Sequence, residues 1–158
     1  YNKGVFHKNW FIKKDVTVAL DPKVSNSYLF KNSDIITPNI KELADLTKLE
    51  VSDDISIEKA AKKLINEFGI RDIVVTRGDK GMSIIGNNKT SHIPCLKVNN
   101  PDVTGAGDTV IATLSLVYAK TEDIDLAASI ANKAASIVVG QKGTTKIRLK
   151  DLEKLLDT

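Results

Sequence analysis

The residues with the clearest capacity for chemistry lie in one short stretch, residues 100–109, which reads Asn-Pro-Asp-Val-Thr-Gly-Ala-Gly-Asp-Thr. From residue 108 to residue 119 the apolar side chains recur at helical spacing, which predicts a helix there. Gly105, Ala106 and Gly107 are therefore expected at the N-terminus of this helix. Backbone N–H groups at such a position lack helical partners, and together with the positive end of the helix dipole they bind anions.

Asp108 follows these glycines directly and has two interpretations. A carboxylate in the first turn of a helix is stabilised by the helix dipole, and this role requires no chemistry. A carboxylate beside an anion site, however, would repel a bound phosphate unless it had a function there. The function that fits is general-base catalysis, in which Asp108 accepts the proton of a hydroxyl that attacks the bound phosphoryl group. The stretch lacks the spacing of a Walker loop, so that type of phosphate site is excluded here.

A second polar pair, Asn39 and Glu42, follows a short apolar run that ends at Pro38. Asn39 is well placed as the N-cap of a helix, with Glu42 at its third position. This is the spacing of a capping box, which accounts for both residues structurally.

A glycine-rich turn at residues 76–81 is the third candidate, since it separates two apolar strand-like runs. Gly78 and Gly81 permit a close approach of the backbone, and Thr76 and Arg77 carry side chains suited to phosphate oxygens. The alternative is an ordinary hairpin turn. His92 and Cys95, expected on the returning strand, have no metal-site spacing and are expected to be structural.

The composition is that of an ordinary globular domain, with 158 residues, 42% apolar and 27% charged. The net charge of +3 is too small, and the lysines too scattered, to indicate a nucleic-acid partner. A single cysteine excludes an internal disulfide and favours a reducing, cytoplasmic location. No apolar run reaches membrane-spanning length, so no membrane partner is expected.

Strand-like and helix-like segments alternate along the chain, which predicts an α/β domain with a mostly parallel sheet. Gly69 is expected to end the clearest helix, and Pro101 is expected to hold Asn100 in extended backbone. The expected strands are residues 16–20, a short buried strand that runs into Pro38, residues 70–76 and 82–85, and the returning strand that holds His92 and Cys95. The expected helices are one that follows Asn39, residues 52–68, 108–119 and 123–139, and a short tail helix over 149–156.

Residues 102–114 resemble the C-terminal signature of the ribokinase-like (PfkB) carbohydrate kinases. They are most similar to the bacterial heptose 7-phosphate kinase branch, where the helix continues with a similar Thr-Val-Ile-Ala-Thr-Leu run. Most of the family has Ala or Gly where this chain has Thr113, and this departure favours the heptose branch. Weaker motifs occur in the family's order: Asp-Pro-Lys at 21–23, Asn-x-x-Glu at 39–42 and Thr-x-Gly-x-x-Gly at 76–81.

The resemblance covers nearly the whole chain and implies a three-layer α/β fold with a mainly parallel sheet, of the ribokinase type. Residues 1–5 resemble the family's Asp-Tyr-x-Lys-Gly segment without its Asp. In the heptose kinases this segment lies near the middle of the kinase domain. Residues 1–158 are therefore expected to be the C-terminal, nucleotide-binding part of a single kinase domain whose N-terminal part is absent. On its own this part is expected to transfer little phosphate.

The same resemblance implies an ATP-dependent sugar kinase. Asp108 would be the base, and the amides of Gly105, Ala106 and Gly107 would hold the γ-phosphoryl group. The motif Asn39-Ile40-Lys41-Glu42 would lie by the ATP phosphates, with Glu42 orienting Mg²⁺ through water. The acceptor in the heptose branch is D-glycero-β-D-manno-heptose 7-phosphate, phosphorylated at its anomeric oxygen.

Further roles are implied for residues that the sequence explains equally well without chemistry. Asp21 would lie near the phosphate and metal region, or would simply form a turn. Asn132 would lie by the adenine, or would face solvent on a helix. Asp102 and Thr104, with the region around residues 140–145, would form a monovalent cation site, as for K⁺, and the turn at residues 76–81 would contact the nucleotide.

Two other functions stay open. Another sugar or nucleoside kinase of the same family would share these motifs, because the family's sugar-binding residues come mostly from the N-terminal half. A non-catalytic nucleotide-binding fragment would also retain them. The implied partners are small molecules, ATP and a sugar phosphate, and a homodimer is one possible assembly.

Overall fold

The computed structural model describes residues 16–141, 147–148, 150–151 and 153. The expectations for residues 1–5 and for most of the tail helix lie outside these residues. The elements in chain order are β1 (Ala19–Leu20), η1 (Val24–Asn32), β2 (Ile35–Ile36), α1 (Ile40–Thr47), α2 (Asp54–Phe68), β3 (Asp72–Thr76), η2 (Gly78–Lys80), β4 (Met82–Gly86), β5 (Thr90–Ile93), α3 (Ala106–Thr121) and α4 (Ile124–Val139).

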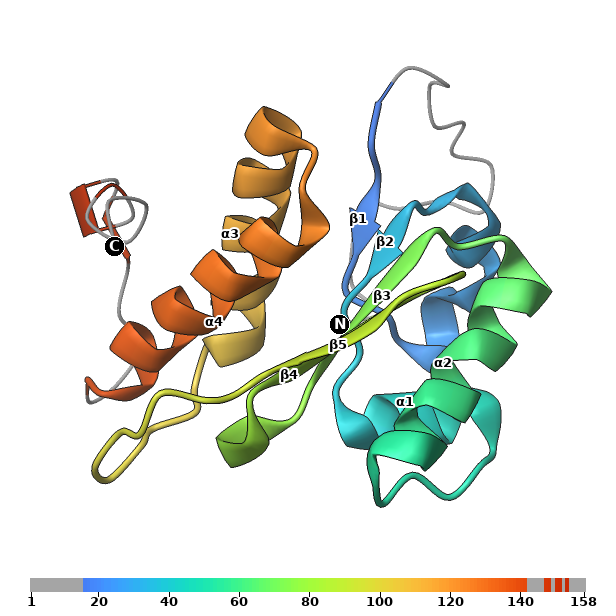
Figure 1. Ribbon diagram of the computed structural model, residues 1–158, viewed down its shortest axis with the longest axis horizontal. Helices are drawn as coiled ribbons and strands as arrows, with labels where there is room; N and C mark the ends of the chain where they lie inside the picture. Colours follow the sequence, from blue (N-terminus) through green and yellow to red (C-terminus); the bar gives the residue numbers. More distant parts are fainter. Residues whose placement is uncertain (1–15, 142–146, 149, 152, 154–158) are drawn as a thin grey trace.

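The five strands form one sheet in the order β1-β2-β3-β4-β5 (Figure 1). β1, β2 and β3 run parallel, with α1 and α2 connecting β2 to β3. β4 and β5 are added antiparallel through the short turns at residues 77–81 and 87–89, since only antiparallel neighbours can be joined by so few residues. The sheet is therefore mixed, and its parallel part is the half nearest β1.

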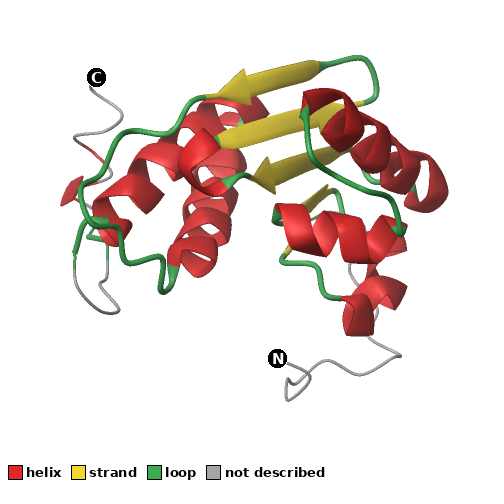
Figure 2. Cartoon of the chain, turned by 90° about the horizontal axis from the view of Figure 1, so that it is seen from below, coloured by secondary structure: helices red, strands yellow, loops and turns green. Residues whose placement is uncertain are grey.

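Helices cover both faces of this sheet, which gives the expected three layers (Figures 1 and 2). α1 and α2 lie on one face, and α3 and α4 lie on the other. The middle strand shows how the sequence produces this, because alternate side chains of a strand point to opposite faces. Ile73 and Val75 are buried in the α1–α2 cluster, whereas Val74 between them is buried in the α3–α4 cluster.

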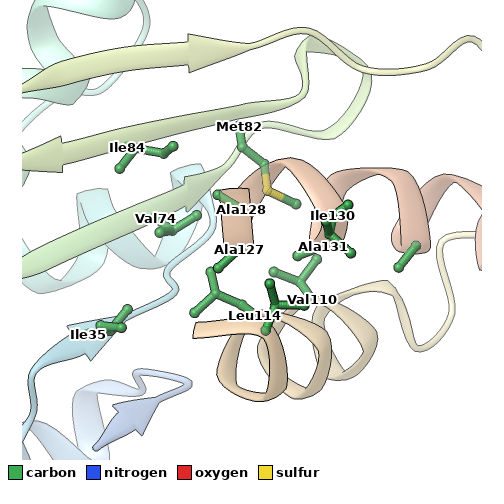
Figure 3. Close-up of a cluster of buried hydrophobic side chains, with 12 residues drawn as sticks. Ile35, Val74, Met82, Ile84, Val110, Leu114, Ala127, Ala128, Ile130 and Ala131 are labelled. Atoms are coloured by element: carbon green, nitrogen blue, oxygen red, sulfur yellow. The ribbon is translucent and has the colours of Figure 1, made fainter. Parts of the chain in front are cut away.

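The α3–α4 layer packs closely on the sheet because α4 presents small side chains (Figure 3). Val74 and Met82 from the strands meet Val110 and Leu114 from α3 in a single buried cluster. The alanines of α4 fill the space between them: Ala127, Ala128, Ala131 and Ala134. Close packing of this kind fixes the position of α3 on the sheet, and with it the position of its N-terminus.

α2 ends before Gly69 as expected and begins at Asp54, two residues after the expected start at Ser52. The N-cap Asp53 accepts a hydrogen bond from the Ser56 N–H at 2.8 Å, and the Ser56 hydroxyl accepts one in return from the Asp53 N–H at 2.9 Å. Gly69 ends the helix with a φ of 70°, in the left-handed region that glycine adopts without steric cost. No helix among the described residues has both the length and the apolar character needed to cross a bilayer.

Two local features differ from the sequence expectations. Residues 24–32 form a 3₁₀ helix where the sequence predicts no element, and its Phe30 is fully buried, with its ring centroid 5.2 Å from that of Phe68. Asn100 has a φ of 51°, so the expectation of extended backbone there is wrong. Asparagine tolerates the left-handed region better than most residues because its short polar side chain can bond locally.

Gly81 in the turn between β3 and β4 is required by both space and backbone. Its φ is 83°, and a Cβ atom there would lie 2.0 Å from the Ile93 carbonyl oxygen and 2.6 Å from the Cys95 N. The turn therefore presses directly on the chain that leaves β5, and no side chain fits between them.

We expect Gly81→Ala to destabilise the fold more than Gly69→Ala, which is a matched control. At Gly69 the backbone lies in the left-handed helical region, which costs an L-residue about 1–2 kcal/mol, and nothing lies within 4 Å of the Cβ position. Gly81, with φ 83° and ψ −128°, lies outside that region and also has backbone atoms against its Cβ position. Thermal unfolding of the two variants side by side measures the added cost of the backbone conformation and the close contact at Gly81. Equal losses in both variants would contradict the close approach described here.

Candidate active site

The carboxyl ends of the three parallel strands meet at one edge of the sheet. β1 ends just before Asp21, β2 leads through Pro38 into Asn39, and β3 ends at Thr76. The Thr76 N–H donates to the Pro38 carbonyl at 2.9 Å, and Asn39 and Thr76 form a parallel bridge. Open α/β sheets bind ligands at this kind of edge, and the structure places three of the sequence motifs there.

The N-terminus of α3 lies at the same edge, beside β1. Gly105 precedes the helix with a φ of 77°, and the first helical hydrogen bond runs from the Thr109 N–H to the Gly105 carbonyl at 3.0 Å. The helix therefore starts two residues earlier than expected and includes Gly107 and Asp108. Both residues are exposed, and nothing lies within 4 Å of a Cβ position on Gly107.

The amides of this turn are not all available for an anion. The Ala106 N–H donates to the Val103 carbonyl at 3.2 Å, so the expectation that three successive amides are free is wrong for Ala106. The amides of Gly107 and Asp108 occupy the first turn, where helix geometry provides no carbonyl partner. Because both residues are exposed, these two amides are the candidate donors for an anion.

Asp108 belongs to a cluster of charges with Asp21, Lys23 and Glu42. The Lys23 ammonium lies 3.2 Å from Asp21 Oδ2 and forms an ion pair with Glu42 Oε1. Asp108 lies close enough to Asp21 for its charge to act on that carboxyl group. The cluster thus joins the ends of β1 and β2 to the start of α3.

The pKa values of Asp21 and Lys23 are both raised. Burial raises the pKa of Asp21; Lys23 opposes this rise, while the charges of Glu42 and Asp108 add to it. Burial lowers the pKa of Lys23, but its hydrogen bond to Glu42 and the charge of Asp21 outweigh burial and raise it overall. The net field at this edge therefore favours a bound cation.

Asn39 and Glu42 form the capping box that their spacing predicts. Asn39 Oδ1 accepts from the Glu42 N–H, and Glu42 Oε2 accepts from the Asn39 N–H, both at 2.9 Å. The two oxygens of Glu42 thus have different partners, since Oε1 is the one that contacts Lys23. A capping role and a place in the site coexist in the same side chain.

Comparison with known proteins identifies the family. The sequence matches the profile of the pfkB family carbohydrate kinases over residues 10–151. The chain belongs to this family. It is 36% identical over 166 residues to the bifunctional protein HldE of Campylobacter concisus, covering 100% of this chain and 35% of that protein. It is 42% identical over 135 residues to HldE of Mesorhizobium japonicum, covering 85% of this chain and 27% of that protein.

Solved structures of related kinases share the fold. A ribokinase of Thermotoga maritima superposes with a TM-score of 0.79 at 29% identity, covering 91% of this chain and 50% of that one. A ribokinase of Arabidopsis thaliana, complexed with ribose and ATP, superposes with a TM-score of 0.81 at 27% identity, covering 90% and 48%. The chain therefore spans about a third or less of the HldE proteins and about half of these ribokinases.

Arg77, expected to meet phosphate oxygens, is bound elsewhere in this kinase fold. Its Nη2 donates to Asp54 Oδ1 at 2.5 Å, and its Nη1 donates to Ser83 Oγ at 2.9 Å and lies 3.2 Å from His92 Nδ1. Asp54 lies on α2, Ser83 on β4 and His92 on β5. In the sheet, β2 and β3 separate β4 from β1. The guanidinium therefore braces the turn at residues 76–81 against α2 and the hairpin.

Asn132 is buried in α4, with 5% of its surface exposed, so the solvent-facing alternative is wrong. Its Nδ2 donates to the Pro94 carbonyl at 2.8 Å, which ties the segment after β5 to α4. This bond gives Asn132 a structural role, and its contact with adenine stays a prediction.

The other candidates are placed as follows. Ile40 is half-buried and lines a pocket of about 160 Å³ together with Arg77 and Lys80, on the α1–α2 side of the turn. Lys41 and Gly78 are exposed, and Gly78 has a φ of 60°. These positions flank the strand-end site, and their contacts with nucleotide stay predictions.

Asp102 and Thr104 form the loop that leads into α3. Asp102 Oδ1 accepts from the Thr104 N–H at 3.1 Å, and the Asp102 N–H donates to the Val139 carbonyl at the end of α4 at 2.8 Å. The loop is thereby fixed beside the α3 N-terminus. Residues 142–146, expected on the other side of a cation site, lie outside the described residues, so the K⁺ site stays a prediction.

The residues present fit ATP and Mg²⁺. The exposed amides at the start of α3 suit a phosphoryl group, and Asp21 and Glu42 offer the oxygen ligands that Mg²⁺ prefers. Within the part of the chain that the structure describes, no three His, Cys, Asp or Glu side chains converge to enclose a metal. Glu42 and Asp21 would therefore hold Mg²⁺ largely through its waters and the phosphates.

We expect Arg77→Met to lower stability by about 1–2 kcal/mol, because it removes charged hydrogen bonds of which one partner is exposed. Nucleotide affinity should change little. Thermal unfolding and calorimetric ATP binding on the same preparation check both parts. Lys80→Met, which removes an exposed cation from the same turn, is the control. A large loss of ATP affinity in a folded Arg77→Met protein would show that Arg77 binds phosphate after all.

Proposed function

We propose that this chain carries the nucleotide-binding and catalytic part of an ATP-dependent sugar kinase. The observation that carries the proposal is the position of Asp108: its carboxylate lies in the first turn of α3, beside exposed amides and within the electrostatic reach of Asp21. An anion site and a base adjoin at the carboxyl ends of parallel strands. This combination suits transfer of a phosphoryl group to a hydroxyl.

In this proposal the amides of Gly107 and Asp108 bind the oxygens of the γ-phosphoryl group. They are fixed before the substrate arrives, because α3 is held on the sheet by its buried residues Val110 and Leu114. Donors that need no reorganisation stabilise the charge that develops in the transition state most effectively. Mg²⁺, when bound, would neutralise part of the phosphate charge near Glu42.

Asp108 accepts the proton of the sugar hydroxyl as its oxygen attacks the phosphorus. The alternative, a first-turn carboxylate that only stabilises α3, makes no use of the exposed amides or of the nearby acids. Family membership supports the catalytic role, since a carbohydrate kinase transfers a phosphoryl group to a hydroxyl of a sugar.

For the acceptor we propose D-glycero-β-D-manno-heptose 7-phosphate, phosphorylated at its anomeric hydroxyl as a precursor for lipopolysaccharide synthesis. The identity to HldE proteins, 36% and 42%, supports this choice over ribose, since the ribokinases are 29% and 27% identical. The remainder of a longer kinase domain would supply most of the sugar site. Assay of the full-length protein with ATP against a panel of sugars and sugar phosphates tests the choice.

We expect Asp108→Asn in the full-length protein to lower kcat by about 10²–10⁴-fold, the usual effect of losing a general base. ATP affinity should hold or rise slightly, because a negative charge beside the phosphates is removed. If Asp108 only stabilises the helix, kcat stays normal and stability falls by about 0.3–1 kcal/mol. Steady-state kinetics and thermal unfolding on one preparation separate these outcomes.

Asp125→Asn is the matched control, since Asp125 is also a first-turn carboxylate, in α4. It contacts Lys89 and Ser91 near the β4–β5 turn, at the opposite end of the sheet. This variant should keep its kcat. A folded Asp108→Asn protein with the turnover of the wild type would remove the proposed mechanism.

A further inference from the structure

Lys23 is held in the charge cluster in an unusual way. Its ammonium bridges two carboxylates, those of Asp21 and Glu42, that come from the ends of different strands. Its side chain is 39% exposed and that of Glu42 is 20% exposed, so the pair lies at the rim of the site rather than in the core. An ammonium there occupies the position that a bound cation would take between the two acids.

Phosphoryl transfer at this site requires a positive group that can move to the phosphate oxygens when the substrate binds. ATP would bring further negative charge to an edge that already holds Asp21, Glu42 and Asp108. During transfer the phosphoryl group spreads charge over its equatorial oxygens, and positive groups beside it stabilise that state. Arg77 is paired with Asp54 at the start of α2 and does not provide such a charge.

We propose that Lys23 is a catalytic residue: its ammonium leaves Glu42 and contacts the oxygens of the transferring phosphoryl group. This inference rests on the proposed kinase function. A lysine has a flexible four-carbon stem, so its ammonium moves over a few ångströms without a backbone change. Glu42 stays in place when Lys23 leaves, because its Oε2 is held by the Asn39 N–H at 2.9 Å.

The exchange also frees Glu42 Oε1 for the waters of a metal ion. In the transfer itself a bond forms between the sugar oxygen and the γ-phosphorus, and the bond from that phosphorus to the β–γ bridging oxygen breaks. The hydroxyl proton passes to Asp108, and ADP leaves with the electron pair. Lys23 neither gives nor takes a proton in this step; it supplies only charge and hydrogen bonds.

The test compares Lys23→Met, Lys23→Arg and the control Lys59→Met, an exposed lysine on α2, in the full-length protein. For Lys23→Met we expect kcat to fall by about 10²–10³-fold, as when one preorganised donor is removed from a transition state. Lys23→Arg should retain part of the activity, and Lys59→Met all of it.

A second readout uses binding alone. Calorimetry with a non-hydrolysable ATP analogue and with ADP, both with Mg²⁺, measures the preference for a γ-phosphoryl group. Lys23→Met should lose about tenfold or more of that preference, since a charged hydrogen bond is worth at least that factor. A purely structural ion pair would lower the melting temperature without changing the preference.

The outcomes separate this inference from the proposed function. Suppose that the wild-type protein is active and that folded Lys23→Met keeps a normal kcat and a normal preference for the γ-phosphoryl group. This result would overturn the role of Lys23 and leave the proposed kinase function standing. A wild-type protein that phosphorylates no sugar would overturn both. If Lys23→Met does not fold, Lys23→Gln, which keeps a polar contact to Glu42, is measured in its place with the same expected losses.

Discussion

Like charges crowded beside the ends of β1 and β2 and the start of α3 are the constraint on which the candidate site depends. Asp21 follows β1, Glu42 follows β2, and Asp108 opens α3 beside them. Burial raises the pKa of Asp21, and the charges of Glu42 and Asp108 add to this rise because like charges repel. Lys23 relieves the repulsion through its two ion pairs. Proteins retain arrangements of this kind where a ligand completes the charge balance, which is the basis of the kinase proposal.

The two hydrophobic clusters hold this charge in place. On one face the alanines of α4 let α3 pack tightly on the sheet, which fixes where the amides of Gly107 and Asp108 lie. On the other face α1 and α2 are buried against β3, which fixes the Asn39 cap beside Thr76. The site is thus assembled from elements that belong to separate clusters and meet only at the sheet edge. Rigid elements of this kind hold catalytic groups more accurately than loops do.

Features set by neighbouring residues could be predicted from the sequence. The capping box of Asn39 and Glu42, the end of α2 at Gly69 and the start of α3 near Gly105 all depend on contacts within a few positions. Features set by distant partners could not. Lys23 meets Glu42 across 19 positions and Arg77 meets Asp54 across 23, and spacing along the chain carries no signal for either pair. The sequence indicates Lys23 only through its place in the Asp-Pro-Lys motif at residues 21–23, directly after an expected strand.

The central claim is that the start of α3 binds the transferring phosphoryl group with Asp108 facing the acceptor hydroxyl. A crystal structure of the full-length protein with ADP, Mg²⁺, tetrafluoroaluminate and the sugar acceptor tests it most directly. The account predicts that the fluoride ligands accept from the amides of Gly107 and Asp108, and that a hydroxyl of the sugar lies within hydrogen-bond reach of the Asp108 carboxylate. A mimic bound away from α3, or an acceptor hydroxyl directed away from Asp108, would contradict it.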